Sequence, residues 1–145
     1  MSRVLWAMAA LVVSSAPVPA FAGMVTEDGR LLLRLNDRAT VHIDGDRFGV
    51  AEDAQLAGDG PPYARDRIQV SFQQTGSGYI LTVANGYGQP LDYEAEIFLK
   101  DGRHGPTSIC TVSAGQFNTE SWRDDLIGIA LSKPRLVSEK DMACD

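Results

Sequence analysis

The strongest constraint in this sequence is a repeated alternation of apolar and polar residues. It is clearest in LDYEAEIFLK at 91–100, where one set of positions is apolar: Leu91, Tyr93, Ala95, Ile97 and Leu99. Successive side chains of a β-strand point to opposite faces of the sheet. The segment is therefore predicted to be a strand with one buried face and one solvent-facing face.

Six further segments alternate in the same way or are rich in β-branched residues: 31–35, 41–44, 68–74, 79–84, 107–112 and 126–131. In the last of these, Ile127, Ile129 and Leu131 are expected on one side. No long segment has a helical period of 3.6 residues. About seven short strands separated by turns predict an all-β sandwich or barrel.

Glycine-rich segments mark the turns between these strands. TGSG at 75–78 joins two alternating segments and predicts a tight hairpin. NGYGQP at 85–90 and DGRHGP at 101–106 are predicted to be longer turns. The segment 50–66 has no alternation, and its AEDAQLA is compatible with one or two helical turns. Such a long loop is either functional or a crossover between sheets, and we favour the crossover.

The first 22 residues resemble a secretory signal peptide. Arg3 precedes an apolar stretch from Val4 to Val13, and Ala20-Phe21-Ala22 forms an A-x-A cleavage site. The apolar stretch is much shorter than the ~20 residues that cross a bilayer, which argues against a membrane anchor. We expect a single domain at 23–145, exported to the periplasm or secreted after cleavage between Ala22 and Gly23, with no membrane span in the mature chain.

The charge balance argues against one class of partner. The chain carries 13 Lys and Arg against 19 Asp and Glu, a formal net charge of −6. Nucleic-acid binding depends on clustered Lys and Arg side chains that contact phosphates. We therefore expect no nucleic-acid partner.

Cys110 and Cys144 are the two cysteines of the chain. Export places them in an oxidising compartment, where cysteine pairs form disulfides. The predicted bridge would attach the C-terminal tail to the body of the domain. A free, nucleophilic thiol is the less favoured alternative, because it needs an unbonded cysteine and a nearby base.

Several sequence motifs partly resemble catalytic or metal sites, but none fits. DGDRFG at 44–49 has acids at the first and third positions of a calcium loop, but the fifth position is Phe48 and the twelfth is Gln55, where oxygen donors and an acid are needed. His42 and His104 have no second ligand at the close spacing of a zinc site. No G-x-S-x-G motif of a serine hydrolase is present. Trp122 is interpreted as part of the core, rather than as a ligand platform. We predict no catalytic residue, no metal and no cofactor.

The C-terminal half resembles small uncharacterised exported bacterial proteins. The resemblance is carried by NGYGQPLDYEAEIF, TSIC, ESW, a last apolar strand and a terminal cysteine. It implies an antiparallel β-sandwich that is immunoglobulin-like or fibronectin-like, with a structural disulfide. It implies no activity.

The polar side of 91–100 is the main candidate site. Asp92, Glu94, Glu96 and Phe98 are predicted to point away from the core, with Tyr87 at the other end of the row. The row is either a solvated acidic surface or an anchor for a basic partner. The opposite side is expected to pack with a shared core: Tyr93, Ile97, Leu81, Val83, Val70 and Phe72.

Three functional hypotheses remain open. The first is an exported, soluble interaction module that binds another envelope or secreted protein. The second is a small hydrolase that uses carboxylates, and the third is a structural component of an envelope assembly. A sandwich fold does not choose between them, because such folds carry many functions.

The signal-peptide assignment predicts the mature N-terminus. Mass spectrometry of the protein exported by its native host should find Gly23 as the first residue, because Ala20 and Ala22 provide the small side chains that cleavage requires. An exported species that retains residues 1–22 would contradict the assignment.

Overall fold

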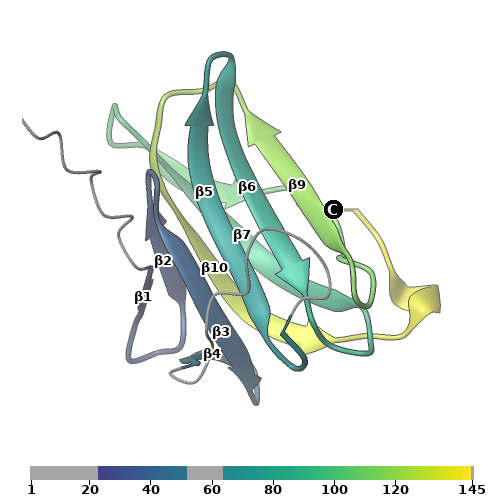
Figure 1. Ribbon diagram of the computed structural model, residues 1–145. Helices are drawn as coiled ribbons and strands as arrows, with labels where there is room; N and C mark the ends of the chain where they lie inside the picture. Colours follow the sequence, from purple (N-terminus) through teal and green to yellow (C-terminus); the bar gives the residue numbers. More distant parts are fainter. Residues whose placement is uncertain (1–22, 52–63, 145) are drawn as a thin grey trace, which may run out of the picture.

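The fold is an all-β sandwich of two antiparallel, five-stranded sheets that pack face to face (Figure 1). The computed structural model describes residues 23–51 and 64–144. The predicted signal peptide lies outside the described residues, as does most of the loop expected at 50–66 with its helical turns. The two-sheet sandwich predicted from the alternation is confirmed.

The first sheet, called the β7 sheet here, has five strands in the order β1 (Met24–Val25), β2 (Leu31–Arg34), β10 (Leu126–Leu136), β7 (Leu91–Leu99) and β8 (His104–Thr107). β10 and β7 occupy its centre, and each pairs antiparallel with both of its neighbours.

The second sheet, called the β6 sheet, has the order β4 (Arg47–Val50), β3 (Arg38–Asp44), β5 (Ile68–Thr75), β6 (Gly78–Asn85) and β9 (Phe117–Trp122). The predicted hairpin at 75–78 is present, because Thr75 pairs with Gly78 across a two-residue turn. A short 3-10 helix, Glu139–Asp141, follows β10.

The structure has ten strands where the sequence predicts about seven. Four strands were not predicted, β1, β4, β8 and β9, and all four lie at sheet edges and lack a clear apolar alternation. The prediction of a strand at 107–112 is wrong. Thr107 ends β8, and the residues after it form only isolated bridges from Cys110 and Val112. Part of the turn expected at 101–106 is instead the start of β8.

The core lies between the two sheets and is built from alternate residues of the central strands. Fully buried side chains from both sheets meet there: Leu31, Leu33, Leu91, Ile129 and Leu131 from the β7 sheet, and Val41, Ile68, Phe72, Leu81 and Val83 from the β6 sheet. Five of the six predicted core residues are buried, and Ile97 is only partly buried at the margin of the core. Burial of this apolar surface is the main favourable term in folding.

Two β-bulges in β10 change which residues face the core. One shift in the pairing with β7 lies between Leu126 and Gly128, and the other lies between Ser132 and Arg135. The first turns Ile127 outward, so that 53% of it is exposed, and the expectation that Ile127 shares a face with Ile129 is wrong. An extra residue in one strand reverses the alternation at that point.

The disulfide between Cys110 and Cys144 is present and attaches the tail as predicted. Main-chain and side-chain hydrogen bonds support it, since the amide of Thr111 donates to Ala143 O at 2.9 Å and its hydroxyl donates to the same oxygen at 3.0 Å. The segment after the 3-10 helix is therefore fixed against residues 110–111 rather than packed into the core.

Trp122 ties the two sheets together at one edge. Its indole Nε1 donates to Thr107 Oγ1 at 2.8 Å, joining β9 of one sheet to β8 of the other. The ring is half-buried and packs against the core. Phe117, at the other end of β9, is 57% exposed.

None of the described residues forms a helix that is long and apolar enough to cross a membrane.

The burial difference between Leu81 and Ile97 gives a stability prediction. Leu81→Ala should lower the free energy of unfolding by about 2–5 kcal/mol, because it removes a fully buried side chain and leaves a cavity. Ile97→Ala should cost less, because part of that side chain already contacts water. Urea unfolding of both variants measures the difference, and an equal or larger cost for Ile97→Ala would contradict the assigned core.

Candidate functional site

The candidate site is the outer row of β7, defined as Asp92, Glu94, Glu96 and Phe98. These residues alternate with Leu91, Tyr93 and Ala95, which are buried, so the row lies on the outer face of the β7 sheet as predicted. Neighbouring strands place basic or aromatic side chains beside each member of the row. The contacts between these side chains and the row determine what the row can bind.

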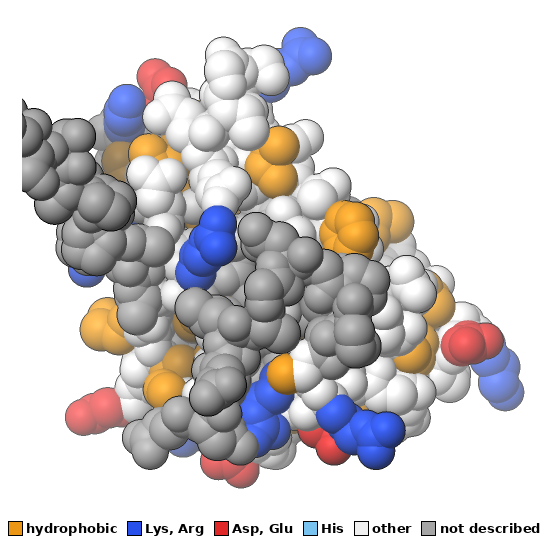
Figure 2. Space-filling view, viewed as in Figure 1, with side chains coloured by type: hydrophobic (Ala, Val, Ile, Leu, Met, Phe, Trp, Pro, Cys, Tyr) orange, Lys and Arg blue, Asp and Glu red, His pale blue; other side chains and the backbone are white. Residues whose placement is uncertain are grey.

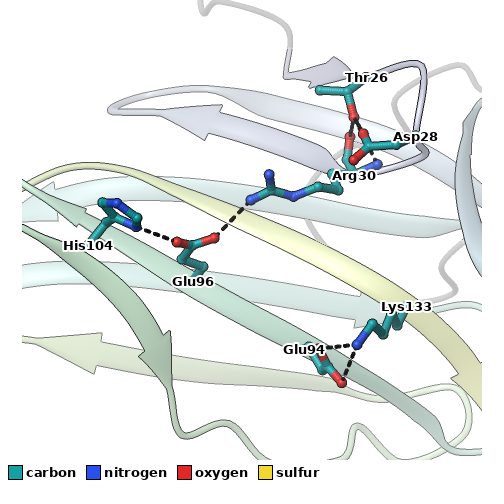
Figure 3. Close-up of polar contacts among 7 residues, drawn as sticks. All are labelled: Thr26, Asp28, Arg30, Glu94, Glu96, His104 and Lys133. Carbon is teal, nitrogen blue, oxygen red and sulfur yellow. Dashed lines mark hydrogen bonds and ion pairs between the residues drawn. The ribbon is translucent and has the colours of Figure 1, made fainter.

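Glu96 is the centre of the row and is bound from both sides. Its Oε2 accepts a hydrogen bond from Arg30 Nη2 at 3.0 Å, and its Oε1 lies 2.7 Å from His104 Nδ1 (Figure 3). Arg30 immediately precedes β2, and His104 begins β8. The contacts of Glu96 therefore reach across the sheet from β2 to β8.

The turn before β2 holds Arg30 in place for this contact. The amide of Arg30 donates to Thr26 Oγ1 at 3.1 Å, and the amide of Thr26 donates to Arg30 O at 2.9 Å. The Thr26 hydroxyl also donates to Asp28, and this hydrogen bond lowers the pKa of the Asp28 carboxyl (Figure 3). A fixed backbone at Arg30 limits the conformations from which its guanidinium reaches Glu96.

The other two carboxylates of the row pair with cations of β10. Lys133 Nζ lies 3.0 Å from Glu94 Oε2, and Arg135 Nε donates to Asp92 Oδ2 at 2.7 Å. Both cations follow the point where we expected the last strand to end. β10 continues past Ser132 because Lys133 adopts a positive φ of 51° at the second bulge, where Pro134 is accommodated.

Phe98 ends the row and stacks on His104. The two ring centroids are 5.7 Å apart, and the planes differ by 22°. His104 therefore contacts Glu96 through its edge and Phe98 through its face. The phenyl ring is half-buried rather than fully exposed.

The outer row is consequently not an unpaired acidic surface. Each of its three carboxylates contacts a basic side chain, either of β10 or of the turn before β2. Exposed ion pairs contribute little to stability individually, about 0–1 kcal/mol. Their main effect here is to balance the charge of the row and to restrict its side chains.

Tyr87 does not join the outer row. Its hydroxyl accepts a hydrogen bond from the amide of Ile43 in β3 at 2.8 Å, and its ring packs against the core. Its own amide donates to Asn85 Oδ1 at 3.0 Å. The buried Asn85 side chain also donates to Gln89 O at 2.8 Å. These contacts give Tyr87 a structural role in the turn at 85–90.

A hollow of about 450 Å³ lies beside the outer row and is open to solvent. Charged side chains of Arg30, Glu94 and Glu96 line it together with the apolar Pro106 and Ile109. It lies where β8 has ended at Thr107 and no longer covers the edge of β7. The hollow thus combines both signs of charge with an apolar wall.

Tyr93 lies behind the row and also lines the hollow. Its hydroxyl is buried and has no hydrogen-bond partner among the described residues. Burial raises the pKa of the Tyr93 phenol, and the negative charges of Glu120 and Asp92 raise it further. The phenol therefore stays protonated in the folded protein well above the pH at which a free tyrosine ionises.

Within residues 23–51 and 64–144, no three His, Cys, Asp or Glu side chains lie together in a way that would hold a metal ion.

The basic partners of the row, Arg30, His104, Lys133 and Arg135, were not predicted from the sequence. The spacing of Lys133 and Arg135, two residues apart, was an available sign that an alternating strand continues after Leu131. Pro134 obscured it, because proline usually ends a central strand. Arg30 had no sequence signal, since its contact with Glu96 spans 66 residues.

Comparison with known proteins finds no matching family model, no similar curated protein and no similar solved structure. The resemblance to small exported bacterial proteins therefore remains a hypothesis, and function has to be argued from the geometry of the site.

The buried phenol gives a prediction about alkaline pH. Tyrosines of the unfolded chain ionise near pH 10, whereas Tyr93 keeps its proton in the folded state. The unfolded state thus binds fewer protons above that pH, and the free energy of unfolding falls as the pH rises. Tyr93→Phe should lack this loss, so its stability relative to the wild type should increase between about pH 8 and about pH 11.

Urea unfolding of both proteins at the two pH values measures this change. Tyr79→Phe is the control, because Tyr79 is a second buried tyrosine of the core. A stability difference between wild type and Tyr93→Phe that does not change with pH would contradict the assignment.

Proposed function

We propose that this chain is an exported, soluble interaction module that binds another envelope or secreted protein through the outer face of the β7 sheet. The observation that carries the proposal is the outer row, whose carboxylates are held by ion pairs, next to the open hollow. Binding surfaces whose side chains are ordered before contact lose less conformational entropy on association. The ion pairs of Asp92, Glu94 and Glu96 supply such ordering.

The charge pairing changes the kind of partner that fits. A uniformly basic partner would compete with Arg30, Lys133 and Arg135 for carboxylates that are already bound. A partner segment with both charge signs can instead exchange contacts with the row, and an apolar side chain of that segment can enter the hollow beside Pro106 and Ile109. We therefore favour a mixed-charge protein segment over a basic one.

The hydrolase alternative receives less support from the same residues. Glycosidase-type carboxylates face one another across a cleft, about 5–10 Å apart. Here the three carboxylates follow one another along a single strand face, and each contacts a cation. This arrangement favours binding over acid–base catalysis.

Export is supported by two features. The A-x-A site at residues 20–22 suits signal-peptide cleavage between Ala22 and Gly23. The disulfide between Cys110 and Cys144 fits an oxidising compartment such as the periplasm or the extracellular medium. The partner is accordingly sought among proteins of that compartment.

An affinity-capture experiment tests the proposal. The mature domain, residues 23–145, is immobilised and exposed to the exported protein fraction of the native host. Ser132→Trp places a large ring at the wall of the hollow, and Phe98→Ala removes the stacked phenyl ring. Both variants should lose a protein that the wild type captures.

Gln73→Trp is the matched control, because Gln73 is exposed on the β6 sheet and gains the same bulk. It should retain the partner. Thermal unfolding must show that all three variants are folded. Equal capture by wild type, Ser132→Trp and Phe98→Ala, or capture of nothing by the wild type, would contradict the proposal.

A further inference from the structure

The main-chain hydrogen bonding of β7 is interrupted at Tyr93. On the side of β8, Leu91 exchanges two main-chain hydrogen bonds with Val112, at 2.8 and 2.9 Å, and Ala95 is paired with Thr107. Tyr93, which lies between them, belongs to no residue pair of β7 with β8 or with β10. None of the described residues forms a main-chain hydrogen bond with it. An extended residue in the middle of the strand therefore has an unpaired amide and an unpaired carbonyl.

The register of β7 shows where these two groups point. Leu91 is hydrogen-bonded on the side of β8, and the amide of Leu99 donates to Arg103 O, just before β8, at 2.9 Å. Successive residues of a strand direct their main-chain groups alternately to its two sides. Tyr93 follows Leu91 by two residues, so its amide and carbonyl also point to the side of β8.

The segment that follows β8 does not close this gap, because its amides have other partners. Cys110 donates its amide to Glu120 Oε1 at 2.8 Å, and Thr111 donates its amide to Ala143 O at 2.9 Å. The chain thus turns away from β7 along this segment and pairs with it again only at Val112.

The hollow beside the outer row lies at this gap. Tyr93 lines it together with Thr107, where β8 ends, and with the apolar residues Pro106 and Ile109. The side chain of Tyr93 points into the core and is buried, so the part of this residue that borders the hollow is its main chain. One main-chain donor and one main-chain acceptor are therefore placed next to each other at a cavity of about 450 Å³ that is open to solvent.

We propose that the hollow binds the side-chain carboxamide of a glutamine or asparagine through the main-chain groups of Tyr93. The Tyr93 amide donates to the carboxamide oxygen, and the Tyr93 carbonyl accepts from the carboxamide nitrogen. This inference rests on the proposed function, because it names the side chain with which the partner segment enters the hollow.

A carboxamide is the side-chain group that matches both unpaired groups of Tyr93. It carries an acceptor oxygen and a donor nitrogen side by side, whereas a carboxylate only accepts and an ammonium group only donates. A ligand that replaces water without loss has to reproduce the hydrogen bonds of that water, and the carboxamide does so at both groups. A carboxylate would also be repelled by Glu94 and Glu96, which line the same hollow. The methylene groups of a glutamine would contact Pro106 and Ile109.

Addition of a whole strand does not fit this gap. Strand addition uses a row of free main-chain groups along the edge of a sheet. Leu91 and Ala95, the nearest residues that point to the same side, are already paired with Val112 and Thr107. The free stretch is a single residue long, which suits one side-chain group.

Hydrogen exchange of the mature, disulfide-bonded domain tests the unpaired amide. The amide of Tyr93 should exchange with solvent deuterium faster than the amides of Leu91 and Ala95 on either side of it, because those two residues are paired on the same side of the strand.

Propionamide, which is the glutamine side chain without its main chain, tests the ligand chemistry. Titrated into the isotope-labelled mature domain, it should move the NMR signal of the Tyr93 amide proton downfield in a saturable manner, because a hydrogen bond forms there. Propionate and N,N-dimethylpropionamide are the matched probes. Each should give a clearly smaller shift, because it can accept from the Tyr93 amide but has no N–H to donate to the Tyr93 carbonyl.

Two variants show where propionamide binds. Ser132→Trp places a large ring at the wall of the hollow and should abolish the shift. Gln73→Trp should retain it, because Gln73 is exposed on the β6 sheet, on the opposite face of the sandwich, where the surface over β6 and β9 is mainly uncharged (Figure 2).

The proposal is overturned if the Tyr93 amide exchanges as slowly as those of Leu91 and Ala95, if the three probes give equal shifts or none, or if Ser132→Trp keeps the response. Capture of a partner by a wild-type domain whose Tyr93 signal does not respond to propionamide would overturn the carboxamide site alone. A saturable response without any captured protein would support the carboxamide site and overturn the proposed function.

Discussion

The pairing of β7 with β10 at the centre of one sheet is the interaction on which the other features depend. It joins the two longest strands, Leu91–Leu99 and Leu126–Leu136. Their inward side chains supply much of one wall of the core, and the register places Lys133 and Arg135 near the carboxylates of Glu94 and Asp92. One pairing therefore fixes both the apolar face and the charged face of β7.

The same pairing decides how the outer row can function. The acidic strand β7 lies beside β10, which carries Lys133 and Arg135. The carboxylates of the outer row therefore contact cations of the same domain and are not available to a basic ligand. The row is held by neighbours on β10, β8 and the turn before β2. A surface of this kind presents a fixed pattern of both charge signs, with an apolar hollow beside it. Recognition then depends on shape and on the order of charges more than on net charge.

The alternation along 91–99 was sufficient to predict β7, its buried face and the sandwich, because burial acts on each strand locally. The disulfide followed from the presence of two cysteines and the expected compartment. The contacts of Glu96 could not be predicted, because they depend on which strands become neighbours. Ile127 was misplaced because a bulge has no clear sequence signal, and Tyr87 was misplaced because its hydroxyl partner lies in the opposite sheet.

A double-mutant cycle on Arg30 and Glu96 tests most directly whether the outer row is neutralised by its own sheet. The free energies of unfolding of Arg30→Ala, Glu96→Ala and the double variant are compared with that of the wild type at low and high salt. We predict a favourable coupling of about 0.2–1 kcal/mol that decreases as salt screens the pair. Additive effects at both salt concentrations would contradict the account, because they would mean that the Glu96 carboxylate gains nothing from Arg30.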